Sequence, residues 1–258
     1  MRHAWLMLVL VGAAACARAS GGQSDAAPGD TVIVDGAVDA NNCSSQPCSI
    51  LPQCGCGGAN ACDIDVSDNK GTTCRAVATP GTETAACNGV TQCDKGYVCL
   101  GGSAFASCKK YCTADADCGS PRGACVIDIT ANGTPLMGIP SVCSSNCDPQ
   151  STNSPECPST YKCGLFNATH NGTQVRIADC SPAGTGTQGA SCASGTMGAD
   201  NLCAKGYLCS TITTDTAFKC RRICKPNEVP TGCGAAQCLK FNPVFTIGTP
   251  PVEYGICN

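Results

Sequence analysis

Apolar residues form one long run in this chain, and it lies near the N-terminus. The run extends from Trp5 to Val11, follows Arg2 and leads into the small residues at positions 12–15. It is too short to span a bilayer as a helix, and a charged start, a short apolar middle and a small-residue exit are typical of an export signal. We therefore predict that residues 1–15 are a signal peptide and that the mature chain lies outside the cytoplasm.

Downstream, apolar positions form only short β-prone runs, two pairs of which flank an Asn-Gly. Asn132-Gly133 divides VIDITANGTPLMGIPSV, and Asn171-Gly172 divides LFNATHNGTQVRIA. Asn-Gly favours a tight hairpin because both central residues of the turn need positive φ. The segment CLKFNPVFTIGTPPVEYGIC has two similar runs around a longer, proline-containing loop. These patterns predict short antiparallel β-hairpins and little helix outside the signal peptide.

The cysteine content explains how such short elements can be stable. The chain has 27 cysteines among 258 residues, and this density indicates a disulfide scaffold in an oxidising compartment. Zinc ribbons and thioredoxin-like sites need C-x-x-C, which occurs nowhere in the sequence. We therefore predict a small disulfide-rich fold that is mostly irregular, with paired cysteines and neither a metal ion nor a cofactor.

Cys16 ends the predicted signal, and two interpretations of it are open. Ala13-Ala14-Ala15-Cys16 resembles a bacterial lipobox, in which the signal is cut before a cysteine that carries lipid, although that pattern prefers Leu at the place of Ala13. Alternatively, Ala15-Cys16-Ala17 is an A-x-A site for ordinary signal peptidase, which gives a freely secreted chain. Whether it is lipidated or removed, Cys16 leaves 26 cysteines, an even number that can pair completely.

The segment after Cys16 favours the lipoprotein. It is rich in Gly, Ala, Ser and Asp and has no periodic apolar face, so residues 16–42 are predicted to be a lipidated cysteine and a flexible tether. A tether is useful only if its far end is attached, and several acyl chains on one residue give stable anchoring in a membrane. By resemblance to lipoproteins of this type, Ala17 rather than Asp after the lipidated cysteine implies the outer membrane.

The cysteines after residue 80 fall into five quartets. In each quartet, four to six residues separate the second and third cysteines, while the outer gaps vary. The quartets are Cys87, Cys93, Cys99, Cys108; Cys112, Cys118, Cys125, Cys143; Cys147, Cys157, Cys163, Cys180; Cys192, Cys203, Cys209, Cys220; and Cys224, Cys233, Cys238, Cys257. Three junctions between quartets are C-x-x-x-C. The fourth junction, SPAGTGTQGAS (181–191), is predicted to be a linker. It would separate a unit of three modules (87–180) from a unit of two modules (192–257).

Residues 43–74 form a further module with six cysteines. Four of them, Cys48, Cys56, Cys62 and Cys74, can be interpreted as another quartet, with a bond between Cys43 and Cys54 added. Cys54 and Cys56 are too close in sequence to bond without strain. Each quartet allows three pairings among which the sequence does not choose; we favour first-to-third with second-to-fourth, because it ties the tight middle loop to both arms. All 26 of these cysteines are predicted to form disulfides.

One heptapeptide occurs twice. CDKGYVC at 93–99 returns as CAKGYLC at 203–209, and CPSTYKC at 157–163 is its counterpart in the third quartet. A fixed cysteine spacing with varying contents is typical of stacked small modules. We therefore expect a structural unit whose tyrosine ring covers a disulfide, with a tyrosine-centred binding site as the alternative.

CTADADC at 112–118, followed by a second cysteine pair, and CDKGYVC resemble the Dickkopf-like and related cysteine-rich repeats of predicted bacterial surface lipoproteins. The resemblance covers residues 87–257 and rests on cysteine spacing with an Asp or a Gly-Tyr. It implies an extracytoplasmic module of unassigned role.

Candidates for catalysis and metal binding are few. His170, in the turn NATHNGT, is the only histidine after the signal, and every cysteine near it is committed to pairing, so it is predicted to be a polar turn residue. Asp63, Asp65 and Asp68 suggest calcium, but an EF-hand loop from Asp63 needs Gly at its sixth position and Glu at its twelfth, where Asp68 and Cys74 stand. A calcium loop of another type stays open as an alternative.

The N-x-S/T sequons at Asn132, Asn167 and Asn171 are expected to be unmodified, because a lipobox implies a bacterial host. The formal charge of −3 and the lack of a basic stripe with interleaved aromatics argue against nucleic acid as a partner.

Together these features predict a non-enzymatic, lipid-anchored extracytoplasmic protein for adhesion, recognition or envelope scaffolding. Its partners would be the membrane, through the lipid, and a protein or glycan ligand held by exposed loops. The alternative is a freely secreted proteinase inhibitor that exposes the basic pair Lys109-Lys110 or Arg221-Arg222. A hydrolase is the weakest hypothesis, since a general base other than His170 is lacking.

Overall fold

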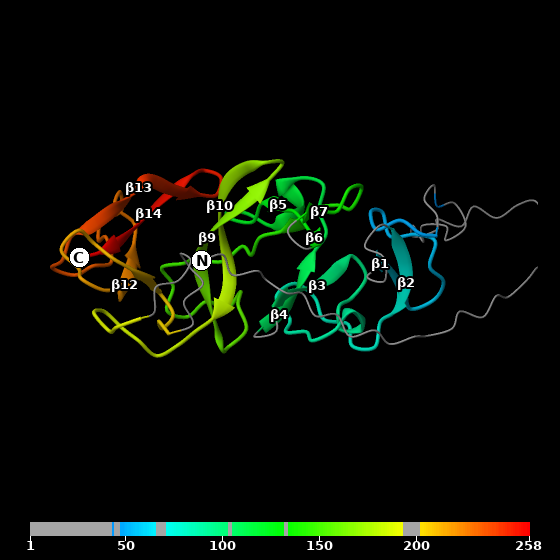
Figure 1. Ribbon diagram of the computed structural model, residues 1–258, viewed down its shortest axis with the longest axis horizontal. Helices are drawn as coiled ribbons and strands as arrows, with labels where there is room; N and C mark the ends of the chain where they lie inside the picture. Colours follow the sequence, from blue (N-terminus) through cyan, green and yellow to red (C-terminus); the bar gives the residue numbers. More distant parts are fainter. Residues whose placement is uncertain (1–42, 44–46, 66–70, 103–104, 132–133, 193–201) are drawn as a thin grey trace, which may run out of the picture.

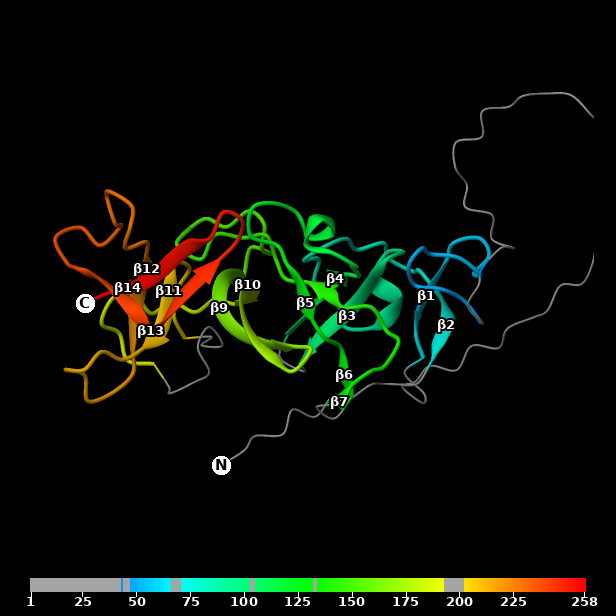
Figure 2. The ribbon, with the colours of Figure 1, turned by 90° about the horizontal axis from the view of Figure 1, so that it is seen from above.

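A computed structural model describes residues 43, 47–65, 71–102, 105–131, 134–192 and 202–258. The predicted signal peptide, Cys16 and the tether lie outside these residues. The described chain forms a row of small β-hairpin modules that follow one another along the long axis of the molecule (Figures 1 and 2). The predicted class, a disulfide-rich fold of short antiparallel hairpins with little helix, is confirmed.

All strand pairs in the described residues are antiparallel, and most sheets have two strands. The strands of the N-terminal module and of the first two quartets are β1 (Asn60–Ile64), β2 (Thr72–Ala76), β3 (Tyr97–Gly102), β4 (Phe105–Lys110), β5 (Cys125–Ile127), β6 (Thr130–Ala131), β7 (Thr134–Pro135) and β8 (Val142–Cys143). The remaining strands are β9 (Tyr161–His170), β10 (Thr173–Pro182), β11 (Tyr207–Ser210), β12 (Lys219–Cys224), β13 (Cys238–Ile247) and β14 (Val252–Cys257). The largest sheet has the order β11-β12-β14-β13. Two short 3-10 turns, Val90–Gln92 and Asp115–Cys118, are the helical elements of the described residues.

The hairpins form where the Asn-Gly pattern predicts them. Asn171 and Gly172 have φ of 49° and 76°, and they join β9 to β10 in register from His170 opposite Thr173. The other pair, Asn132-Gly133, lies outside the described residues, but the flanking strands β6 and β7 are paired. The third predicted segment forms β13 and β14, whose register shifts near the proline-containing part of β13.

The 26 cysteines of these modules form thirteen disulfides. In every quartet the first cysteine bonds the third and the second bonds the fourth. The bonds are Cys87–Cys99, Cys93–Cys108, Cys112–Cys125, Cys118–Cys143, Cys147–Cys163, Cys157–Cys180, Cys192–Cys209, Cys203–Cys220, Cys224–Cys238 and Cys233–Cys257, with Cys43–Cys54, Cys48–Cys62 and Cys56–Cys74 in the N-terminal module. They join cysteines 11 to 25 positions apart. A bond around a ~15-residue loop stabilises the fold by about 3 kcal/mol, so two bonds per module compensate for a small core.

Cysteine sulfur and tyrosine rings do much of the packing inside the modules. The buried cluster of the second quartet consists of its four cysteines alone. Tyr97 packs against the buried cysteines of the first quartet, Tyr161 against those of the third and Tyr207 against those of the fourth. The expectation that this repeated tyrosine covers a disulfide is therefore confirmed.

Two larger clusters join neighbouring modules. One cluster takes residues from the N-terminal module and from quartets one and two, including Ile50, Val98 and Val142. The other joins quartet three to quartets four and five, including Leu165 and Ile223. The third quartet thus shares its apolar cluster with the two quartets that follow it, and ion pairs connect it to the two that precede it.

The segment 181–191 does not behave as a linker. The backbone N–H of Gly184 donates to the carbonyl of Cys203 at 2.9 Å, and that of Gly186 donates to the carbonyl of Leu202 at 2.9 Å. In the first module Gly81 makes the equivalent bond to Gln92, at 3.0 Å. GTETAAC (81–87) and GTQGASC (186–192) are therefore equivalent, and each repeat begins six residues before the first cysteine of its quartet.

Candidate functional site

The repeated heptapeptide folds as the same tight turn in both copies. Gly96 and Gly206 both have φ of 80°, a conformation that favours glycine. The backbone N–H of Tyr97 donates to the carbonyl of Asp94, and that of Tyr207 donates to the carbonyl of Ala204. The carbonyl oxygens of the first cysteine and of the tyrosine in this turn accept hydrogen bonds from the preceding hairpin.

In the first copy these two carbonyls bind an arginine of the preceding hairpin. Arg75, on β2, donates from Nη1 to the Cys93 oxygen at 2.7 Å and from Nη2 to the Tyr97 oxygen at 2.7 Å. Its Nε contacts a carboxylate oxygen of Asp63 on β1. Arg75 is only 7% exposed, so this charged side chain fastens the N-terminal module to the first quartet from within.

In the second copy a lysine takes the same place. Lys162, on β9, donates from Nζ to the Cys203 oxygen at 3.2 Å and to the Tyr207 oxygen at 3.0 Å. It is fully buried. The heptapeptide is therefore a docking unit used twice: each copy accepts a cation from the hairpin that precedes it, once from Arg75 and once from Lys162.

Asp63 stands at the centre of the first of these contacts. Burial raises its pKa, while the charge of Arg75 and the hydrogen bond from the Tyr111 hydroxyl oppose that rise. The pKa of Tyr111 lies well above its usual value, because the ring is buried and faces the Asp63 carboxylate. Both Asp63 oxygens are therefore engaged, and Asp68 of the suggested calcium loop lies outside the described residues.

The basic pairs suggested for an inhibitor are structural. Lys109 is 6% exposed and binds Asp179 and Ser145 of the third and second modules, while Lys110 donates to a backbone carbonyl at 2.7 Å. Arg221 is 7% exposed and pairs with Asp215. The inhibitor alternative took these pairs as exposed, whereas the first residue of each pair is buried in an ion pair.

Asp148 connects three modules. Its Oδ2 lies 3.1 Å from Nη2 of Arg122 and 3.1 Å from Nζ of Lys225, and its Oδ1 accepts from the Tyr254 hydroxyl at 3.3 Å. Burial raises the pKa of Asp148, but hydrogen bonds from the Gln150 backbone and Lys225, together with the two cations, outweigh burial and hold the pKa below its usual value.

This lowered pKa predicts a pH dependence of stability. An acid whose pKa is lower in the folded state stabilises the fold above its unfolded pKa, about 3.9, and loses that contribution as the pH falls through the folded value. We expect the free energy of unfolding, measured by guanidinium denaturation, to decline as the pH falls below about 4. The decline should be shallower in Asp148→Asn; an identical decline in this variant would contradict the assignment.

His170 ends β9 and contacts an aspartate of the second module. Its Nδ1 lies 2.8 Å from Asp128 Oδ1, and its Nε2 lies 3.0 Å from the Asn171 amide nitrogen. The hydroxyl of Ser141 donates to Asp128 rather than to the imidazole. Both ring nitrogens therefore meet groups that hold the hairpin in place, as expected of a polar residue beside a turn.

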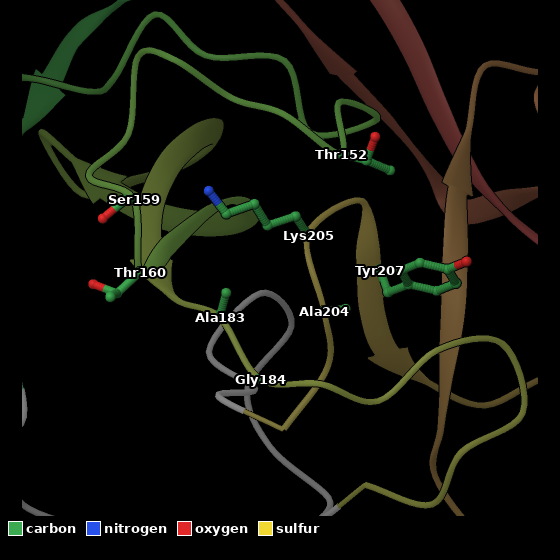
Figure 3. Close-up of a pocket in the computed structure, with 8 residues that line it drawn as sticks. All are labelled: Thr152, Ser159, Thr160, Ala183, Gly184, Ala204, Lys205 and Tyr207. Carbon is green, nitrogen blue, oxygen red and sulfur yellow. The ribbon is translucent and has the colours of Figure 1, made fainter.

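A shallow hollow of about 520 Å³ lies beside the second heptapeptide. It is bordered by Thr152, Ser159, Thr160, Ala183, Gly184, Ala204, Lys205 and Tyr207. Figure 3 shows the Lys205 side chain extending toward the side that holds Ser159 and Thr160. The equivalent Lys95 of the first copy donates to the Gly58 carbonyl at 2.8 Å, whereas Lys205 has no hydrogen-bond or ion-pair partner among the described residues.

Close groups of three cysteines recur in the modules, but their sulfurs belong to the disulfides described above and are not thiolates that could bind a metal. In the part of the chain that the structure describes, no helix has the length and apolar character needed to cross a membrane. Neither a protein-family model nor a curated protein nor a solved structure matches this chain.

Proposed function

We propose that this protein is a lipid-anchored, non-enzymatic surface protein in which a rigid row of modules presents exposed loops for recognition or scaffolding. Its thirteen disulfides indicate an extracytoplasmic, disulfide-stapled protein. Three parts of the proposal rest on the sequence. They are the lipid on Cys16, the location in the outer membrane, and the role in adhesion, recognition or envelope scaffolding. The resemblance to Dickkopf-like repeats is part of the same proposal.

The fastening of the modules supports this proposal best. Arg75 and Lys162 dock into the two heptapeptides, and Lys109 and Asp148 form ion pairs that join residues of different modules. Such contacts oppose hinge motion, because breaking them leaves a charge buried without its partner. Attached through residues 16–42, a row of this kind would hold its C-terminal modules farthest from the membrane.

Two of the basic residues on which the inhibitor alternative depended are not exposed. Lys109 and Arg221 are buried, and both belong to strands of a sheet. An inhibitor needs an exposed residue that can enter the protease pocket, which neither of these residues supplies.

The lipid anchor is tested by the intact mass of the protein from its native membrane fraction, alkylated without reduction. We expect a chain that begins at Cys16, carries acyl chains and takes up no alkylating agent. A Cys16→Ala variant should lose the added lipid mass and leave the membrane fraction. A mature chain that begins near Arg18 would make the protein freely secreted, and alkylated thiols would contradict complete pairing.

A further inference from the structure

A second hollow opens where the β9–β10 hairpin leaves the core and passes β13. At the base of the hairpin, Leu165 and Ala178 are buried in one cluster with Phe245 of β13. Two positions nearer the tip, the same face carries Asn167 and Arg176, which stand directly opposite each other in the sheet. The apolar face thus becomes polar while it still borders β13.

The hollow has a volume of about 550 Å³ and combines hydrogen-bonding groups from both sides. It is lined by Asn167, Gln174, Arg176, Pro243 and Thr246. The amide of Gln174 donates to the Thr169 hydroxyl at 2.8 Å, which fixes this side chain and leaves its amide oxygen as an acceptor. Asn167 is exposed and keeps both its donors and its acceptor for a ligand.

Arg176 is held in place without using its N–H groups. The central carbon of its guanidinium lies 5.3 Å from the centroid of the Phe245 ring, and Phe245 is 1% exposed. Such stacking orients the guanidinium plane. Among the described residues Arg176 has neither a hydrogen-bond nor an ion-pair partner, so its fork of donors is oriented and free.

These groups select a ligand by their chemistry. An arginine fork matches a carboxylate, which it binds through two parallel hydrogen bonds. Side-chain amides offer a donor and an acceptor together, as adjacent sugar hydroxyls require. We propose that this hollow binds a saccharide that carries a carboxylate, such as a uronic acid residue, with Arg176 on the carboxylate and with Asn167 and Gln174 on hydroxyls. This inference deepens the proposed recognition role and rests on it.

The proposal is tested by isothermal titration of the full mature protein with oligogalacturonate. We expect Arg176→Met to weaken binding about tenfold or more, the loss expected for a charge-assisted hydrogen-bonded pair. Methionine keeps an apolar cover on Phe245, so an unchanged melting temperature shows that the fold is intact. Lys205→Met removes an equal charge from the other hollow and should leave binding unchanged.

Three results would overturn the proposal. Equal binding of carboxyl-reduced oligosaccharide would exclude carboxylate recognition, and equal binding of poly-glutamate would assign the site to acidic peptides. Equal weakening by Arg176→Met and Lys205→Met would mean that only overall charge matters. The intact-mass experiment is independent of all three, so the failure of this site and the failure of the lipid anchor are distinguishable.

Discussion

Replacing Arg75 with methionine is expected to lower the free energy of unfolding by about 3–5 kcal/mol, because the buried Asp63 carboxylate would lose its cation. The Cys93 and Tyr97 carbonyls would also lose their donor. The only tryptophan, Trp5, lies in the predicted signal peptide, so unfolding of the oxidised protein in guanidinium is best followed by circular dichroism.

The double variant Arg75→Met with Asp63→Asn is the matched control. It removes both charges and should regain a large part of the lost stability, since the uncompensated charge is the main cost. A loss below about 1 kcal/mol for Arg75→Met alone, the value typical of exposed ion pairs, would show that this contact does not fasten the modules.

Replacing Asp179 with alanine is expected to cost about 3 kcal/mol, at the lower end of the range for a broken buried pair. Lys109 would lose its ion-pair partner and keep its hydrogen bond to Ser145, while the charge of the half-buried Glu83 carboxylate lies nearby. Burial raises the pKa of Glu83, and the nearby Lys109 and Lys110 oppose that rise. The measurement is the same guanidinium titration.

Glu228→Ala serves as the control for this second variant. Glu228 pairs with Lys225 at 3.5 Å, but its side chain is 53% exposed, and exposed pairs contribute about 0–1 kcal/mol. If Asp179→Ala cost no more than Glu228→Ala, the contact between β4 and β10 would be a surface contact in solution.

The features that the sequence predicts are local ones. Asn171-Gly172 determines the position of its hairpin because both central residues of the turn need positive φ, which these two residues adopt. The cysteine spacing identifies each module, and the pairing of first with third and second with fourth follows the tight middle loop that every quartet contains. Tyr97 and Tyr207 cover disulfides because a small module has little else to bury.

The contacts between modules could not be predicted in this way. Lys109 and Asp179 are 70 positions apart and Tyr111 and Asp63 are 48 apart, so no periodic pattern connects them. The inhibitor alternative needed Lys109 to be exposed, but Asp179 of β10 pairs with it. Arg75 follows Cys74 and Lys162 precedes Cys163; a basic residue beside a hairpin cysteine was the only local sign of the docking contacts.

The hydrogen bonds of the segment 181–191 to the next module could not be predicted from its composition either. Its Gly, Thr and Ser content is typical of linkers, but Gly186 is required where the chain passes close to its neighbours. A Cβ on Gly186 would lie 2.8 Å from Sγ of Cys220, and one on Gly81 would lie 2.7 Å from the Gln92 carbonyl oxygen. Comparison of GTETAAC with GTQGASC would have revealed this part of the repeat.

Docking of cations into the repeated heptapeptide, together with the ion pairs around it, is expected to make the modules one rigid body. Residual dipolar couplings of the backbone amides in β3–β4 and in β11–β12 test it most directly. If the modules are one rigid body, one alignment tensor fits both sets of couplings. Two tensors of clearly different magnitude would mean that the modules reorient independently and would contradict the claim.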